Sequence, residues 1–212
     1  MAGLREKQKA DRERRILQAA VTKFRADGYR AVRIEDLAEM AEVSVGTVYN
    51  YYQTKGDILM ATVTMEVEEV LEAGLAILAD PPEAVGDALL ALIFSYYDHS
   101  LKYLSKEMWR SAMALAIEAP GTPNGRRYFE MDQRLAAQMS DLVAELQNRG
   151  SVRRDIDPGL VGILLFNNLN QMFLEFVTQD DMQLDVLRTR VAAQTLAFGQ
   201  LIASDLCNRV DP

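Results

Sequence analysis

Apolar residues recur at helical spacing along almost the whole chain. Ile16, Ala20 and Phe24 stand four residues apart, and similar spacing returns in the later segments. Runs of alternating β-branched residues bounded by turns, which are typical of strands, do not occur in the sequence. The pattern therefore predicts an all-α protein with about nine helices.

Helix breakers divide this pattern into segments. Gly28 is expected to end the first helix in a left-handed turn, and residues 120–125 (PGTPNG) are the densest group of breakers. Asp157 and Pro158 have the residue types of an N-cap and of a first helical position. After the first helix, we expect helices at about 34–40, 45–52, 57–79, 83–104, 106–119, 126–148, 158–178 and 183–206.

Charge is unevenly distributed along the 212 residues. The formal net charge is −8, yet residues 1–33 hold ten Lys/Arg against four Asp/Glu, a local charge of +6, so the other residues sum to −14. A basic end on an acidic body would orient the chain on a polyanion such as nucleic acid. A solvated, charge-rich first helix would explain the same charges, so charge alone leaves both interpretations open.

The composition argues against several classes of protein. His99 and Cys207 are the only His and Cys, which leaves no metal-ligand set, and the sequence has no phosphate loop or dinucleotide motif. We therefore expect no cofactor, and an enzyme is the least expected class. The single cysteine and the absence of a signal-like N-terminus fit the cytoplasm. The most apolar segment, 160–177, contains several Asn, Gln and Glu residues and so predicts no membrane span.

Residues 34–52 predict a short helix, a tight turn and a second short helix. Together with the first helix, this is the layout of a helix-turn-helix. Ser44 has the residue type to N-cap the second short helix. The inward-facing set would be Leu37, Ala38, Val43 and Val48, closed by Phe24 and Tyr52.

The second short helix lies in the stretch VSVGTVYNYYQTKGD, residues 43–57, and leaves side chains suited to a DNA major groove facing outward. Gly46 permits close backbone approach, Thr47 can contact a phosphate or a thymine methyl, and Asn50 can pair with a base edge. Tyrosine hydroxyls and a lysine amine can reach phosphates. The candidate DNA-binding residues are Arg33, Ser44, Val45, Gly46, Thr47, Tyr49, Asn50, Tyr51 and Lys55.

The stretch GYRAVRIEDLAEMAEVSVGTVYNYYQTKGDIL, preceded by a basic helix, resembles the DNA-binding domain of the TetR family of transcriptional regulators. The resemblance is close over residues 12–59, and the order VS-x-GT-x-Y-x-YY-x-x-K is fairly specific for that family. It implies a DNA-binding domain at residues 1–56 and a ligand-binding and dimerisation domain at 57–212. It also implies a homodimer, usually a repressor, that binds a palindromic operator in double-stranded DNA and is released by a small-molecule effector.

Three residues depart from the family pattern. Arg33 stands where the family mostly has Thr or Ser, so the side-chain cap is lost, but an Arg there can reach a phosphate. Glu42 occupies a turn position usually held by Gly, which costs stability and places an acid near DNA. Val45 replaces a frequent Lys and removes a possible backbone contact.

The resemblance, more than the residue pattern, implies an effector pocket in the C-terminal part. An ordinary helical core would have the same apolar pattern, although Met residues adapt well to apolar ligands. The candidate pocket residues, suited to an apolar or aromatic effector, are Phe94, Tyr97, Met108, Trp109, Met113, Phe129, Phe166, Asn170 and Phe173.

The resemblance further implies that helices 158–178 and 183–206 pack against their copies in a partner chain. The candidate interface residues are Leu164, Asn168, Val191, Phe198 and Ile202. The amides at 167, 168, 170 and 171 interrupt the most apolar helix, and each of them could face the dimer interface, a cavity or solvent.

Two other functions remain compatible with the sequence. One is a DNA-binding regulator without a small-molecule effector, and the other is a ligand carrier with a degenerate helix-turn-helix. A core without a cavity would favour the first, and ligand binding without DNA binding would favour the second.

Overall fold

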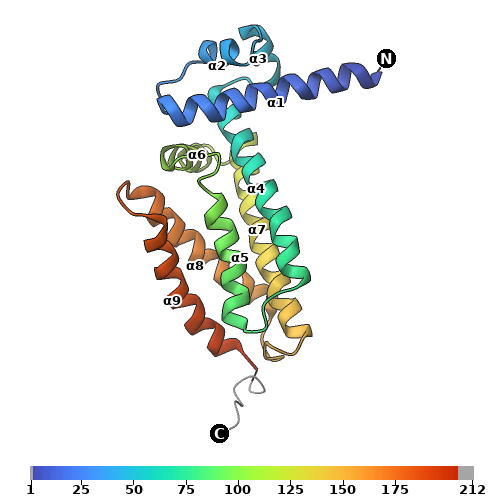
Figure 1. The fold of residues 1–212 in the computed structure, drawn as a ribbon, viewed down its shortest axis with the longest axis vertical. Coiled ribbons are helices and arrows are strands. Elements are labelled where there is room, and N and C mark those ends of the chain that lie inside the picture. Colours follow the sequence, from blue (N-terminus) through green and yellow to red (C-terminus); the bar gives the residue numbers. More distant parts are fainter. Residues whose placement is uncertain (1, 205–212) are drawn as a thin grey trace. The chain divides into compact units, whose positions relative to one another are not determined.

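The computed structural model describes residues 2–204, and over this range the chain is helical (Figure 1). The predicted all-α class with about nine helices is confirmed for these residues. Cys207 and the expected end of the last helix near residue 206 lie outside them. The helices are α1 (Ala2–Asp27), α2 (Ile34–Met40), α3 (Val45–Tyr51), α4 (Lys55–Ala79), α5 (Val85–His99), α6 (Lys106–Glu118), α7 (Pro123–Asn148), α8 (Pro158–Thr178) and α9 (Leu184–Ile202).

The chain forms two compact units, and each is built from two separate stretches. The first unit contains the residues up to Glu66 together with Leu101–Phe129, and the second contains Val67–Ser100 together with the residues from Glu130 onward. Of the three boundaries, one falls inside α4, one between α5 and α6, and one inside α7. This grouping differs from a division at residue 56, because Leu101–Phe129 belongs to the same unit as the helix-turn-helix.

The first unit has a core in which α1, α2 and α3 pack together (Figure 1). Phe24, Leu37 and Val48 are buried as predicted, and burial of such side chains contributes roughly 1.5–3 kcal/mol each. Gly28 follows α1 with φ of 85°, so the predicted left-handed turn is confirmed. Tyr52 is also buried, whereas Val43 is half-buried.

In the second unit, α9 packs against α5 and α8 (Figure 1). Gly86 on α5 and Gly199 on α9 meet at this contact. A Cβ atom at Gly199 would lie 2.9 Å from the Cα of Gly86, too close for any real side chain. The two glycines therefore allow α5 and α9 to approach each other more closely than larger residues would.

Two helices begin earlier than expected because a threonine caps each of them. The predicted loop 120–125 is wrong at its end: α7 begins at Pro123, and the Thr122 hydroxyl accepts a hydrogen bond from the Gly125 N–H (3.2 Å). Proline suits a first helical turn because its missing N–H needs no partner there. Before α4, Thr54 and Asp57 exchange two hydrogen bonds of 2.8 and 3.1 Å, so the helix starts at Lys55.

Two expected helices are shorter than predicted. α5 ends at His99, where the Ser100 N–H bonds to the carbonyls of Tyr96 and Tyr97, and α9 ends at Ile202. After α9, Ala203 forms an isolated antiparallel bridge with Val152. The backbone of Ala203 in this bridge is extended, with φ of −61° and ψ of 147°, and so does not continue the helix.

Among the described residues, α8 alone has the length and apolar composition of a membrane span. Half of its most apolar stretch is buried inside the chain, as in a core helix, so this is weak evidence for a span.

Candidate nucleic-acid interface

The start of α2 has lost its side-chain cap, as the sequence predicted. Arg33 occupies the N-cap position, and its side chain makes no capping hydrogen bond. The Asp36 carboxylate still accepts a bond from the Arg33 N–H (2.8 Å), and the Arg33 Nε lies 3.3 Å from the Glu35 carboxylate. Arg33 is exposed, so a DNA phosphate could reach its guanidinium. The phosphate contact itself stays a prediction.

The turn between α2 and α3 is strained at Glu42. Its φ of 52° lies in the left-handed region, and no other non-glycine among residues 2–204 has a positive φ. One Arg15 guanidinium nitrogen donates to the Ala41 carbonyl (3.0 Å) and lies 4.0 Å from the Glu42 carboxylate. The Glu42 side chain itself is 87% exposed, so it adds a negative charge beside α3.

Replacing Glu42 with Gly should relieve this strain. We expect the free energy of unfolding to rise by about 0.5–1 kcal/mol, measured by urea denaturation, because glycine adopts positive φ without steric cost. DNA binding should tighten as well, because an acid is removed from the DNA-facing side. A Glu42→Gln variant is the matched control: it should tighten DNA binding without the gain in stability. Equal stability of the glycine and glutamine variants would contradict the strain argument.

The N-terminus of α3 is capped as predicted. The Ser44 hydroxyl accepts a hydrogen bond from the Thr47 N–H (3.1 Å) and lies 2.8 Å from the Thr47 hydroxyl. Such caps contribute about 0.5–2 kcal/mol and fix the direction in which the helix begins. Ser44 and Thr47 therefore hold each other at the end of α3 that is expected to meet DNA.

The side chains on the outer face of α3 are accessible. Tyr49 is 49% exposed, Asn50 and Gly46 are exposed, and Val45 is half-buried. A Cβ atom at Gly46 would meet nothing closer than the Ser44 hydroxyl at 3.9 Å, so the chain itself does not require glycine there. This fits a position where a bound molecule approaches the backbone closely.

Two candidate DNA-binding residues make internal contacts instead. The Tyr51 hydroxyl donates to the Lys9 carbonyl (3.0 Å) and so ties α3 to α1. The Lys55 amine donates to the carbonyls of Arg30 (3.0 Å) and Val32 (2.8 Å) and lies over the Tyr29 ring. Burial lowers the pKa of Lys55, and the nearby Glu107 carboxylate opposes that shift. Both residues stabilise the helix-turn-helix, and their phosphate contacts stay predictions.

Sequence reasoning missed the contacts that Leu101–Phe129 makes with the helix-turn-helix. Arg25 donates to the carbonyls of Leu101 (2.7 Å) and Lys102 (2.6 Å), and the Arg30 N–H donates to the Glu107 carboxylate (3.3 Å). The Asn124 amide donates to the Asp57 carboxylate (2.6 Å). No local signal in the sequence marks these pairs, because the partners are at least 67 residues apart.

The candidate pocket residues are divided between the two units. Phe94, Tyr97, Phe166, Asn170 and Phe173 belong to the second unit, and Met108, Trp109, Met113 and Phe129 belong to the first. In the second unit the Tyr97 ring stacks on Phe173 with centroids 6.0 Å apart. The Tyr97 hydroxyl donates to the Leu169 carbonyl (2.8 Å), and burial raises the pKa of this tyrosine. The Arg188 guanidinium covers the Phe94 ring at 4.4 Å.

The candidate dimer-interface residues differ in their exposure. Leu164 is 60% exposed and Asn168 is exposed, whereas Phe198 is half-buried. Val191 and Ile202 are buried inside the single chain, so they do not belong to a surface on which a second copy would dock. The exposed apolar side chains of α8 and α9 are instead Leu160, Ile163, Leu164, Leu174, Val186, Leu196 and Leu201.

The geometry of α1, α2 and α3, with a capped and accessible α3, defines the first unit as a helix-turn-helix of the DNA-binding kind. The family model described as bacterial regulatory proteins, tetR family, matches residues 16–62, which contain α2 and α3. Over these residues the chain matches the tetR family, which confirms the resemblance seen in the sequence.

Similar proteins agree with this match to the tetR family model. The HTH-type transcriptional repressor KstR of Rhodococcus jostii is 36% identical over 64 residues, which is 30% of each chain. The fatty acid metabolism regulator protein of Bacillus subtilis is 23% identical over 181 residues, covering 82% of this chain and 88% of that protein. The match to KstR thus spans less than a third of that relative's length.

A solved structure shows that the likeness in fold extends beyond the helix-turn-helix. The TetR-family repressor FadR of Thermus thermophilus, solved in complex with lauroyl-CoA, has a TM-score of 0.64 and 21% sequence identity. The similarity covers 94% of this chain and 98% of FadR, so the two proteins share a fold over nearly their whole length.

Proposed function

We propose that this chain is a transcriptional repressor of the cytoplasm that binds a palindromic operator in double-stranded DNA as a homodimer. The observation that carries the proposal is the accessible outer face of α3, capped by Ser44 and attached to α1 through Tyr51, within a region that matches the tetR family. A rigid, outward-facing helix start is what direct reading of a major groove needs.

The apolar surface of α8 and α9 supports the homodimer. Soluble monomers rarely expose a large contiguous apolar patch, and here several Leu and Ile side chains of these two helices are exposed. Asn167, Asn168 and Gln171 are exposed on α8 as well, and polar amides between apolar residues would fix the register of an interface. A dimer with two-fold symmetry would place its two copies of α3 on half-sites that are about one DNA turn, roughly 34–36 Å, apart.

A small apolar effector is the proposed ligand. The second unit contains an aromatic group formed by Tyr97, Phe173 and Phe176, with 6.0 Å between successive ring centroids. FadR, which shares the fold, was solved with lauroyl-CoA, a ligand with a long apolar chain. A ligand among the side chains of the second unit would act on α4 and α7, the two helices that continue into the first unit.

Selection of bound duplexes from a random-sequence pool tests the proposal. The full chain at near-physiological salt should enrich an inverted repeat, which then serves as a probe for compounds that release the protein. Enrichment of a single half-site would contradict the homodimer. Weak binding without enrichment would contradict sequence-specific regulation, and retained binding of small apolar molecules would then favour a carrier.

A further inference from the structure

The N-terminal half of α1 lies outside the region that matches the tetR family. The match begins at Ile16, whereas α1 begins at Ala2 and continues without a break to Asp27. Between residues 5 and 15 this part of the helix has six Lys/Arg and three Asp/Glu, and most of its side chains are exposed. It is therefore a regular, basic extension of the helix that supports the helix-turn-helix.

The basic side chains of this extension continue the buried stripe of α1. Ile16 and Ala20 face the core of the first unit and are fully buried. At the same helical spacing towards the N-terminus, this stripe is occupied by Arg5, Lys9 and Arg12. The extension therefore replaces apolar side chains with cations where α1 continues past α3 (Figure 1).

Hydrogen bonds place this basic stripe beside α3. The Tyr51 hydroxyl at the end of α3 donates to the Lys9 carbonyl (3.0 Å), and the neighbouring Tyr52 hydroxyl donates to the Glu13 carboxylate (3.4 Å). These bonds belong to the first unit, so the extension is held in a fixed position relative to α3. A duplex that contacts the outer face of α3 would therefore have its backbone near the extension.

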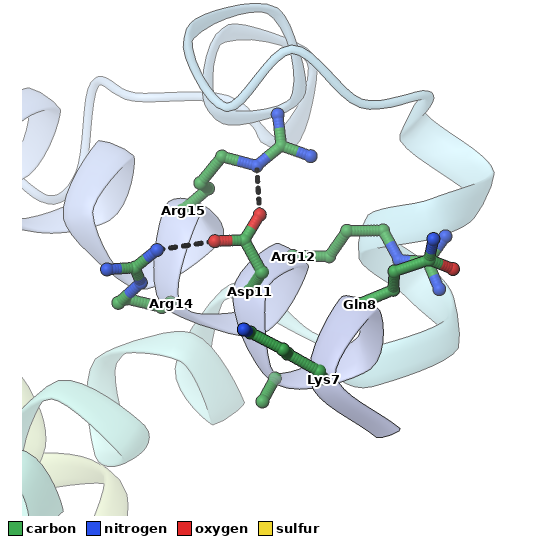
Figure 2. A pocket seen from close by; sticks show the side chains of 7 residues that line it. Lys7, Gln8, Asp11, Arg12, Arg14 and Arg15 are labelled. Atoms are coloured by element: carbon green, nitrogen blue, oxygen red, sulfur yellow. Dashed lines mark hydrogen bonds and ion pairs between the residues drawn. The ribbon is translucent and has the colours of Figure 1, made fainter. Parts of the chain in front are cut away.

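The cations of the stripe have no anionic partner in the described part of the chain. Asp11 pairs with Arg14 and Arg15, as the dashed lines in Figure 2 show. By helical spacing these side chains lie on a different face of α1 from Arg5, Lys9 and Arg12. No acidic group of residues 2–204 lies within 4.0 Å of the charged atoms of Arg5, Lys9 or Arg12. An open hollow of about 820 Å³ runs along residues 7–15 (Figure 2), and of the stripe Arg12 lines it, whereas Arg5 and Lys9 do not.

We propose that residues 5–12 of α1 are a second DNA-contacting element, which binds phosphates of the duplex outside the segment read by α3. The proposal rests on the proposed function. Phosphates are the chemistry that fits, because unpaired Arg and Lys side chains neutralise them with release of counterions. A lipid surface fits less well, since the exposed face of this extension lacks the apolar residues that would insert into a membrane.

An Arg5→Gln, Arg12→Gln variant of the full chain tests this element. Its matched control is Arg153→Gln, Arg154→Gln, which removes two exposed cations from the loop before α8 in the second unit and changes the net charge equally. On the selected operator with long flanks, we expect the test variant to bind roughly tenfold more weakly at 0.15 M salt. The slope of log affinity against log salt should become shallower by about 0.9 for each lost phosphate contact. The control should match the wild-type protein in both quantities.

Trimming the flanking base pairs provides a second readout. Shorter flanks should weaken binding of the wild-type protein and the control, but should have little effect on the Arg5→Gln, Arg12→Gln variant, which has already lost those contacts. Equal affinity, salt slope and flank dependence of the test variant and the control would overturn the proposal. If no operator is enriched, the proposed function fails, and the salt slopes on a duplex of arbitrary sequence still decide whether residues 5–12 bind DNA.

Discussion

A chain with Leu164→Asp and Leu201→Asp should be a folded monomer that binds its operator at least a hundredfold more weakly than the wild-type protein. Leu164 on α8 is 60% exposed and Leu201 on α9 is 71% exposed, so neither substitution disturbs the core of the single chain. In a homodimer through these helices, however, each aspartate would be buried in an apolar interface without a partner, at a cost that prevents association. A monomer has one copy of α3 in place of two, so its affinity for the operator loses an avidity factor of about 10² to 10⁴.

Sedimentation velocity would measure the oligomeric state, and DNA titration would measure the affinity. A control with Leu75→Asp and Ile117→Asp replaces two other exposed apolar side chains, 54% and 70% exposed, on α4 and α6. This control should remain dimeric and bind DNA as the wild-type protein does. A dimeric Leu164→Asp, Leu201→Asp chain would show that the copies associate through another surface.

Replacing Asp132 with Asn should stabilise the protein strongly at pH 8 and not at all near pH 4. Asp132 lies on α7, where burial raises the pKa of its carboxyl from the ordinary value of 3.8 to about 7. Because the folded state holds the proton more tightly than the unfolded state, the stability from this group is present below pH 4 and is lost as the pH rises to about 7. One pKa unit corresponds to about 1.4 kcal/mol, so asparagine should add up to roughly 4 kcal/mol at pH 8.

Urea denaturation at pH 4.5, 6 and 8 would measure this difference in the free energy of unfolding. The matched control is Asp141→Asn, an exposed carboxylate on the same helix, which should change stability by less than about 0.5 kcal/mol at each pH. If the Asp132→Asn protein were no more stable than the wild-type protein at pH 8, ionisation of this buried carboxyl would not be what destabilises the folded chain.

The sequence predicted those features that depend on neighbouring residues. The buried residues of the helix-turn-helix, the Ser44 cap and the strained Glu42 each follow from a few adjacent positions, and the structure contains all three. The internal roles of Tyr51 and Lys55 were not predictable in the same way. Their hydrogen-bond partners are 42 residues away for Tyr51 and 25 and 23 residues away for Lys55, and helical periodicity contains no information about such pairs.

The sequence also could not predict which face of α9 packs against the rest of the chain. Val191 and Ile202 are apolar, as interface residues would be, but they are buried within the chain, where α9 packs on α5 and α8. The contact of Gly86 with Gly199 decides how closely α5 approaches, and a glycine in a helix does not reveal its partner. An apolar helix therefore predicts burial, but not whether the covering surface belongs to the same chain or to a second copy.

The discontinuity of the first unit affects the order of events during synthesis. A ribosome releases residues 1–66 well before Leu101–Phe129, so the nascent helix-turn-helix first folds without Glu107 and Asn124. The side chain of Arg25, the backbone N–H of Arg30 and the carboxylate of Asp57 must remain hydrated until those partners emerge. The nascent chain therefore cannot complete its DNA-binding unit until more than half of the protein has been translated.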